Sequence, residues 1–333
     1  MSTRGRTART TRATEVAPAA VVERLVELAC LAPSIHNTQP WRWRYDGARV
    51  VLEADLDRLL PAEDPRGRNL VLSCGAALHH LEFAARAMGW DVDVDLLPGD
   101  DPAVLASVAV ARDAPRPAVR EDLDLLRTRC TDRRRFTAWP VPDDQLAGLA
   151  ALARRWGTRA EAVTTDAARI RLELLANRAV TAVEVDGRRL LEQDDWIDRP
   201  GPDGIPSALL PDDPDPLRAR SRFRPGVLED TRMVIHGGDR VVAIGGALDE
   251  VGSWLLSGRA MSAVWLEATR AGMSVIPMSQ PVEVEGIRQD LARTVLADVP
   301  EPHLLLRVGW QAIGRSELPR TPRRPLAEVL RRG

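Results

Sequence analysis

Residues 32–43 have the sequence APSIHNTQPWRW, the densest run of polar side chains in the protein. Its two prolines, Pro33 and Pro40, bracket six residues that offer several hydrogen-bond donors and acceptors. Because proline cannot continue a helix, this stretch is predicted to be a loop that follows a helix. Considered alone, the loop suits a binding segment and a turn that merely ends the helix equally well.

The sequence on either side of this loop predicts short strands interleaved with helices. Apolar side chains such as Val22, Leu25 and Val26 recur at helical spacing before the loop and predict an amphipathic helix. After the loop, Asp46-Gly47 lies between two extended runs and predicts a β-hairpin. For the first half we predict helices over 18–32 and 71–88, and strands over 39–43, 49–54, 92–97 and 107–111.

The second half of the chain repeats this order of elements. Leu146 follows Leu25 by 121 residues, whereas Leu266 follows Leu81 by 185, so the second copy is the longer one. We therefore predict an α+β fold with an internal duplication, in which residues 15–120 form the first half and 121–333 the second. The second half is predicted to contain a helix over 143–153 and strands over 159–164, 240–244, 273–277 and 304–308.

A proline-rich insertion at about residues 186–226 accounts for much of the extra length. Seven prolines between positions 200 and 225 argue against a regular helix or strand there. Trp196, Ile205, Leu209 and Leu210 nevertheless give the segment side chains to bury. Long loops in compact domains are usually functional covers or disordered segments. We expect an ordered lid over a site, with a disordered segment as the alternative.

The composition excludes several kinds of chemistry. All 46 basic residues are arginine, and the lack of lysine excludes Schiff-base catalysis and a P-loop within this chain. Its three cysteines form no Cys-x-x-Cys pair, so neither a disulfide framework nor a zinc ribbon is expected. The adjacent His79 and His80 would point about 100° apart on a helix, and we interpret them as core or surface side chains rather than metal ligands.

The net charge and the distribution of apolar residues indicate which kinds of partner and which cellular location to expect. The 46 basic and 48 acidic residues give a net charge of −2, which favours neither a nucleic-acid nor a membrane partner. No stretch approaches the ~20 consecutive apolar residues that span a bilayer. Residues 1–14 resemble a disordered tail rather than a signal peptide. With unpaired cysteines, these features favour a cytoplasmic protein.

One arginine-rich segment is a candidate anion-binding site. It spans residues 127–136 and has the sequence RTRCTDRRRF, whereas residues 320–326, RTPRRPL, suit a basic tail when considered alone. Guanidinium groups with a hydroxyl between them suit a phosphate, which accepts paired hydrogen bonds. One alternative is a solvated helix whose arginines pair with Asp122 and Asp124. A nucleic-acid patch is disfavoured, because no aromatic residues are interleaved.

Together, these segments resemble the FMN-dependent nitroreductase family. APSIHNTQPWRW is similar to the family's A-P-S-x-x-N-x-Q-P-W-x-F stretch, with seven identities, and RCTDRRRF is similar to its early R-x-S/T-x-R/K motif. The order of elements and the Arg-Arg-Pro-Leu segment near the C-terminus also fit. The resemblance is closest to the actinobacterial two-repeat branch of Acg-like NAD(P)H nitroreductases, in which two fused halves take the place of the usual homodimer.

The resemblance implies one FMN site built from both halves. Neither residues 15–18 nor the stretch after Ala153 carries the matching motifs, so the symmetry-related second site is expected to be lost. No catalytic side chain and no metal are expected, because the redox chemistry takes place on FMN. The expected cofactor-binding residues are Pro33, Ser34, Ile35, Asn37 and Gln39 of the loop, Arg129, Thr131 and Arg133 of the first arginine segment, Pro277, Met278, Ser279 and Gln280, and Arg323 and Arg324 near the C-terminus.

The implied activity is that of an FMN-binding oxidoreductase. It would pass hydride from NADPH or NADH through FMN to a nitroaromatic, quinone or similar small-molecule acceptor. The first alternative is a flavin-sequestering or storage protein of the same fold, whose lid blocks substrate access. The second is a flavin-free scaffold that keeps only the fold. The expected assembly is a monomer that acts as a pseudo-dimer, with further oligomerisation left open.

Overall fold

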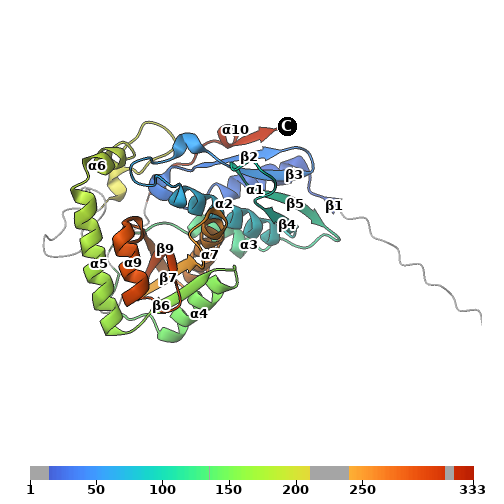
Figure 1. Ribbon diagram of the computed structural model, residues 1–333. Helices are drawn as coiled ribbons and strands as arrows, with labels where there is room; N and C mark the ends of the chain where they lie inside the picture. The colour runs from blue at the N-terminus through green and yellow to red at the C-terminus, as the bar shows by residue number, and fades with distance from the viewer. Residues whose placement is uncertain (1–14, 135, 211–239, 312–318) are drawn as a thin grey trace, which may run out of the picture.

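Two long helices, α2 (Arg68–Ala87) and α7 (Val251–Arg270), pack against each other at the centre of the molecule, and each also packs against one β-sheet (Figure 1). The computed structural model describes residues 15–134, 136–210, 240–311 and 319–333. This arrangement confirms the predicted α+β fold. The predicted tail at residues 1–14 and residues 211–226 of the insertion lie outside the described part of the chain.

The first half folds as one sheet with α1 and α2 packed beside it. Its elements are β1 (Glu15–Val16), α1 (Ala19–Ala29), β2 (Trp41–Tyr45), β3 (Arg49–Ala54), β4 (Asp91–Leu96) and β5 (Val104–Arg112). The predicted hairpin joins β2 to β3, because the Asp46 carboxylate accepts two following backbone amides and Gly47 takes a φ of 92°. Trp41 and Trp43 alternate with arginines along β2 and are fully buried, which fixes the inner face of the sheet.

The second half forms a four-stranded antiparallel sheet and most of the remaining helices. Its elements are α3 (Arg120–Thr128), α4 (Asp143–Arg154), β6 (Arg159–Val163), α5 (Asp166–Glu184), α6 (Gly187–Asp194), β7 (Arg240–Gly246), β8 (Met273–Met278), α8 (Gln280–Glu283), α9 (Glu285–Thr294) and β9 (Glu301–Trp310). The chain then returns to the first sheet through α10 (Leu326–Val329) and β10 (Leu330–Arg332). There β10 pairs in parallel with β2, so the second half of the sequence supplies a strand to the first sheet.

Corresponding strands have the same order in the two sheets. The first sheet contains the run β2-β3-β5, with β4 on β5, and the second runs β6-β7-β9-β8. If β2 to β5 are matched in sequence to β6 to β9, each sheet has the order first, second, fourth, third. Duplication of an ancestral half-chain would give both sheets the same strand order.

Two glycines lie where α2 and α7 meet. Each helix has 20 residues, and α7 begins 183 residues after α2. A Cβ on Gly75 would lie 2.3 Å from the Leu255 carbonyl oxygen, and a Cβ on Gly258 would lie 2.1 Å from the Leu72 carbonyl oxygen. Both contacts obey the same offset of 183 residues, as in a self-complementary interface between two copies. The predicted offset of 185 at this helix is therefore corrected to 183.

Part of the insertion is regular, contrary to the prediction. α6 ends before the first proline, Pro200, and its N-terminus is capped by the Asp186 carboxylate, which accepts hydrogen bonds from two backbone amides. A short 3₁₀ helix, Ser207–Leu209, begins directly after Pro206. The prolines therefore bound these elements rather than prevent them, because proline is tolerated at a helix start.

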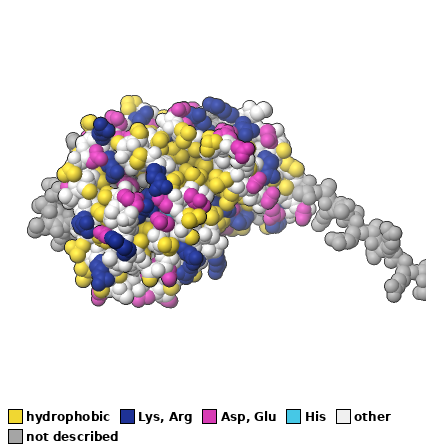
Figure 2. Space-filling view, in the orientation of Figure 1, with side chains coloured by type: hydrophobic (Ala, Val, Ile, Leu, Met, Phe, Trp, Pro, Cys, Tyr) yellow, Lys and Arg dark blue, Asp and Glu magenta, His cyan; other side chains and the backbone are white. Residues whose placement is uncertain are grey.

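The surface is mixed in charge. On the face shown in Figure 2, acidic and basic side chains are interspersed among apolar ones. Among the described residues, no helix combines the length and the apolar character needed to cross a bilayer.

Candidate functional site

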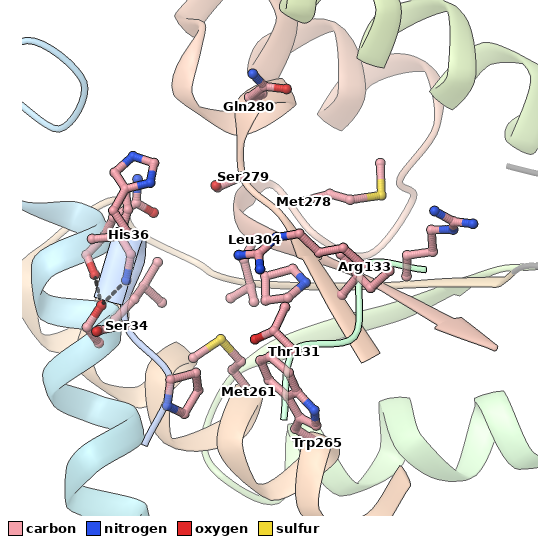
Figure 3. A pocket seen from close by; sticks show the side chains of 18 of the residues that line it. Ser34, His36, Thr131, Arg133, Met261, Trp265, Met278, Ser279, Gln280 and Leu304 are labelled. Carbon is pink, nitrogen blue, oxygen red and sulfur yellow. Dashed lines mark hydrogen bonds between the residues drawn. The ribbon is translucent and has the colours of Figure 1, made fainter. Parts of the chain in front are cut away.

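A cavity lies where the 33–36 loop, α2, α7 and the end of β8 meet. We call it the central cavity, and it has a volume of about 150 Å³. Figure 3 shows Ser34 and His36 on one side of it, Thr131 and Arg133 facing them, and Trp265 below. Its wall is largely apolar, which suits a planar organic ligand. The apolar side chains include Leu72, Met261, Trp265, Ile276, Met278 and Leu304.

A second cavity adjoins the first and is rich in arginine. We call it the arginine cavity, and it has a volume of about 330 Å³. Four residues line both cavities, namely Pro33, Ser34, Thr131 and Arg133. Together the two reach the range of ~300–1,000 Å³ found for small-molecule sites. The arginine cavity is lined by Arg127, Arg129, Arg133, Arg320 and Arg323, and by the apolar Leu31, Leu126, Ile205 and Leu209.

The loop between Pro33 and Pro40 has an unusual backbone, with positive φ angles at three residues that are not glycine. Its φ angles are 44° at His36, 56° at Asn37 and 48° at Gln39, a left-handed region that is costly for residues with a Cβ. The Ser34 hydroxyl accepts the Gln39 amide at 3.0 Å, and the Ser73 hydroxyl of α2 accepts another loop amide at 3.2 Å. These bonds hold a strained conformation of the kind that concentrates at functional sites.

Arg129 is a buried cation in the wall of the arginine cavity. Its side chain stacks 4.7 Å from the Trp265 ring centre, and one terminal nitrogen donates to the Leu31 carbonyl at 3.3 Å. Its Nε and other terminal nitrogen have no hydrogen-bond partner. Burial, followed by the nearby charge of Arg323, lowers the pKa of the Arg129 guanidinium to about 9. Both observations indicate a cation that lacks its anion.

Arg323 reaches the same cavity from the C-terminal segment. Its guanidinium donates to the Asn37 side-chain oxygen at 3.0 Å and to the Thr321 hydroxyl at 2.6 Å, while its Nε has no hydrogen-bond partner. Burial lowers the pKa of Arg323 to about 10. Within the described ranges, no carboxylate forms an ion pair with Arg129, Arg320 or Arg323. The cavity is therefore suited to an anion with several acceptor oxygens.

His36 and Arg307 line the central cavity and are missing from the predicted set. His36 lies 2.5 Å from the Glu63 carboxylate, with both side chains buried, and Gln193 of α6 donates to the same carboxylate at 3.4 Å. Arg307 of β9 lines the cavity and stacks 4.7 Å from the Phe136 ring centre. An arginine inside the apolar run 304–308 was a usable signal for Arg307, whereas no pattern in the sequence pairs Glu63 with His36.

The structure brings most of the predicted cofactor residues to these two cavities. Two lie outside both: Gln39, which is fully buried, and Arg324, whose guanidinium donates to the Gln39 and Trp41 carbonyls and pairs with Asp55. Pro33, Ser34, Ile35, Thr131, Arg133, Pro277, Met278, Ser279 and Gln280 line the central cavity, and Asn37, Arg129 and Arg323 line the arginine cavity.

The position on α2 that the offset of 183 residues relates to Trp265 carries a paired carboxylate. The offset of 183 residues matches Trp265 of the central cavity with Glu82, which is buried and accepts hydrogen bonds from Nε and one terminal nitrogen of Arg259 at 2.9 and 3.1 Å. Arg259 also stacks 4.7 Å from the ring centre of Trp156, which follows α4. The expected loss of a second site stays a prediction.

His79 and His80 are core residues. Both side chains are buried, and each places its Nδ1 within 2.9 Å of the Ser262 hydroxyl on α7. Burial lowers the pKa of His79 to about 3 and that of His80 well below its ordinary value, so both rings are neutral. Within the described residues, no group of His, Cys, Asp and Glu side chains is arranged to hold a metal ion.

The chain is similar over most of its length to proteins of Mycobacterium tuberculosis (strain H37Rv). It is 35% identical over 322 residues to "Putative NAD(P)H nitroreductase Rv3131", covering 94% of this chain and 91% of the relative. It is 33% identical over 326 residues to "Putative NAD(P)H nitroreductase acg", covering 93% and 95%. No family model matches the chain.

Similarity to solved structures is weaker. A nitroreductase with bound FMN from Bacteroides fragilis is 14% identical, with a TM-score of 0.39 over 60% of this chain and 92% of that one. A nitroreductase named as putative, from Anabaena variabilis, is 12% identical, with a TM-score of 0.42 over 87% and 73%. The assignment rests on the two mycobacterial relatives, whose identity and coverage place this chain in the NAD(P)H nitroreductase family represented by Rv3131 and Acg.

Proposed function

We propose that the protein is an FMN-dependent oxidoreductase that uses NADPH or NADH to reduce a nitroaromatic, quinone or similar small-molecule acceptor. The observation that carries this proposal is the buried Arg129 guanidinium, with two donors unpaired, beside a largely apolar cavity. The names of the mycobacterial relatives support the same reaction class. We also propose that one chain supplies the whole site, as a monomer that acts as a pseudo-dimer.

The residues of the two cavities fit the parts of FMN. A phosphate monoester needs several donors and positive charge, which Arg129, Arg323 and the Thr131 hydroxyl would supply in the arginine cavity. A flavin ring needs an apolar slot with a few polar groups, which the central cavity offers between Trp265 and residues 277–280. The shared residues, Ser34 among them, would lie between the phosphate and the ring.

The residues of the chain contribute to turnover by stabilising charge and by excluding water. When bound, FMN supplies the two-electron chemistry between nicotinamide and acceptor. Arg133 and Arg307 line the central cavity, and a guanidinium beside the ring stabilises the negative charge that reduction adds. The apolar wall formed by Met261 and Leu304 excludes water from the transfer.

The alternative is a flavin-sequestering protein whose insertion blocks substrate access. Ile205 and Leu209 of the insertion line the arginine cavity, and none of residues 186–210 lines the central cavity. The described part of the insertion therefore contributes to the wall of the arginine cavity and not to that of the central cavity, which favours the reductase.

One experiment separates these functions. The visible absorption spectrum of the purified protein is recorded first, and NADPH and then NADH are added in the same anaerobic cuvette. A flavin spectrum that bleaches within the mixing time is expected for the reductase. A flavin spectrum that stays oxidised would favour the sequestering protein. A colourless protein that takes up no added FMN would contradict both.

A further inference from the structure

The side-chain amides of Asn37 and Gln39 join three segments that are far apart in the sequence. The Asn37 NH₂ group donates to the Gly204 carbonyl at 2.9 Å and to the Pro322 carbonyl at 3.1 Å. The Gln39 NH₂ group donates to the Pro202 carbonyl at 2.9 Å, and its oxygen accepts the Arg324 amide at 2.8 Å. Both side chains are buried, so these bonds satisfy groups that have no access to bulk water.

The segments held in this way form the wall of the arginine cavity. Pro202 and Gly204 lie within three residues of Ile205, which lines that cavity together with Leu209. A third link holds the same turn, because Arg58 donates to both the Asp203 carboxylate and the Thr38 carbonyl at 2.7 Å. The insertion is thus fastened to the loop at three successive residues, 202, 203 and 204.

The same amides hold a cation in place. The Asn37 side-chain oxygen accepts a hydrogen bond from the Arg323 guanidinium, and the Pro322 carbonyl next to it accepts the Asn37 amide. An arginine side chain loses much of its rotamer freedom when it is fixed. An arginine that is already fixed binds a phosphate without that further loss, which is the benefit of preorganisation.

We propose that Asn37 and Gln39 are positioning residues, which hold the insertion and the C-terminal segment together around the phosphate-binding end of the site. This inference rests on the proposed FMN function and assigns the two amides to cofactor retention rather than to contact with the flavin ring. Loss of either amide should weaken binding of the phosphate and speed its release. The binding of the ring itself should change little.

The test compares FMN with riboflavin, which has the same ring and lacks the phosphate. Asn37→Gly removes the amide and keeps a residue that tolerates positive φ, and Gln39→Ala removes the second amide. Affinity and dissociation rate are measured by flavin fluorescence with the apoprotein. FMN should bind at least tenfold more weakly and leave at least tenfold faster, whereas riboflavin should change less than threefold. Gln289→Ala, on the outer surface of α9, is the matched control and should change neither.

Three outcomes decide between the explanations. An unchanged preference for FMN over riboflavin in folded Asn37→Gly and Gln39→Ala protein would overturn the inference. Wild-type protein that binds both flavins equally, or neither, would instead overturn the proposed phosphate site. Arg58→Gln leaves the two amides intact and loosens the link to Asp203. If the amide variants fail to fold, this variant should still release FMN faster, and an unchanged rate would count against the inference.

Discussion

Arg129 is the residue on which the anion site depends most. Its side chain is 5% exposed and stacked on Trp265, and no carboxylate of the described residues neutralises it. A buried charge without a counter-ion is costly. The folded chain therefore holds an unfavourable cation whose cost a bound phosphate would offset.

Replacing Arg129 by alanine should weaken FMN binding by about 10- to 100-fold. The variant loses charge-assisted hydrogen bonds worth about 1.5–3 kcal/mol, and riboflavin affinity should stay within a few-fold of wild type. Arg24→Ala is the matched control, because that side chain is half-exposed, is paired with Glu27 and lines neither cavity. Equal losses for FMN and riboflavin would show that the substitution damages the cavity rather than a phosphate site.

Asp64 should make the protein less stable as the pH rises. Burial raises the pKa of its carboxyl to about 7, although the group also accepts the Leu70 amide near the start of α2. Between pH 4 and 7 the folded state thus holds a proton that the unfolded state has released, so the free energy of unfolding falls with pH.

Asp64→Asn should remove this loss. The free energy of unfolding of the variant, relative to wild type, should rise by about 2 kcal/mol between pH 5 and pH 8. A difference of one bound proton between the folded and unfolded states corresponds to about 1.36 kcal/mol per pH unit, and the effect builds up over only part of this pH range. Urea denaturation at both pH values measures the difference. Asp93→Asn, at a side chain that is 86% exposed, should show no such trend. A constant difference between wild type and Asp64→Asn would contradict the raised pKa.

Single residues were predictable where a motif marks them and not where a distant partner decides their role. The arginine pattern at 129–133 predicts an anion site, and Arg129 and Arg133 line the arginine cavity. Gln39 belongs to an equally clear motif, yet its partners are residues 202 and 324, which the fold alone brings to it. The same holds for the pairing of His36 with Glu63.

At the scale of elements, the contact between α2 and α7 depends on the absence of side chains at two positions. Gly75→Ala should destabilise the protein by about 3 kcal/mol, because the new Cβ would lie 2.3 Å from a backbone oxygen that cannot move without moving α7. Gly148→Ala on α4 is the control. Nothing lies within 4 Å of its Cβ, so it should stabilise the protein by about 0.5–1 kcal/mol.

Chemical denaturation followed by circular dichroism measures both variants. Gly258→Ala should behave like Gly75→Ala, because its Cβ would meet the Leu72 carbonyl at 2.1 Å. A Gly75→Ala protein as stable as wild type would mean that the two helices pack less closely than described.

Elements with a local signal were predicted well. The hairpin between β2 and β3 follows from Asp46-Gly47, and α1, α2 and α4 follow from apolar periodicity. The helix α6 was missed because prolines elsewhere in the insertion were taken to exclude it. The long helix α5 was also missed, since its outer face carries exposed apolar side chains such as Ile170 and Leu174, which obscure the periodicity.

At the scale of the whole molecule, the two halves are alike in strand order and unlike at their sites. On one side, α7 and the 33–40 loop enclose the central cavity. On the other, Glu82 pairs with Arg259, which stacks on Trp156. The motifs predict that only one site is kept, whereas the return of β10 to the first sheet has no local signal, because strand pairing over nearly 290 residues depends on the complete fold.

Titration of the apoprotein with FMN and with riboflavin by isothermal calorimetry tests the central claim most directly. We expect one FMN per chain, bound at least tenfold more tightly than riboflavin, because the arginine cavity holds the guanidiniums of Arg129 and Arg323, with which no carboxylate of the described residues pairs. Two FMN per chain would contradict the predicted loss of a second site. The absence of saturable FMN binding would contradict the assignment of the arginine cavity to a flavin phosphate.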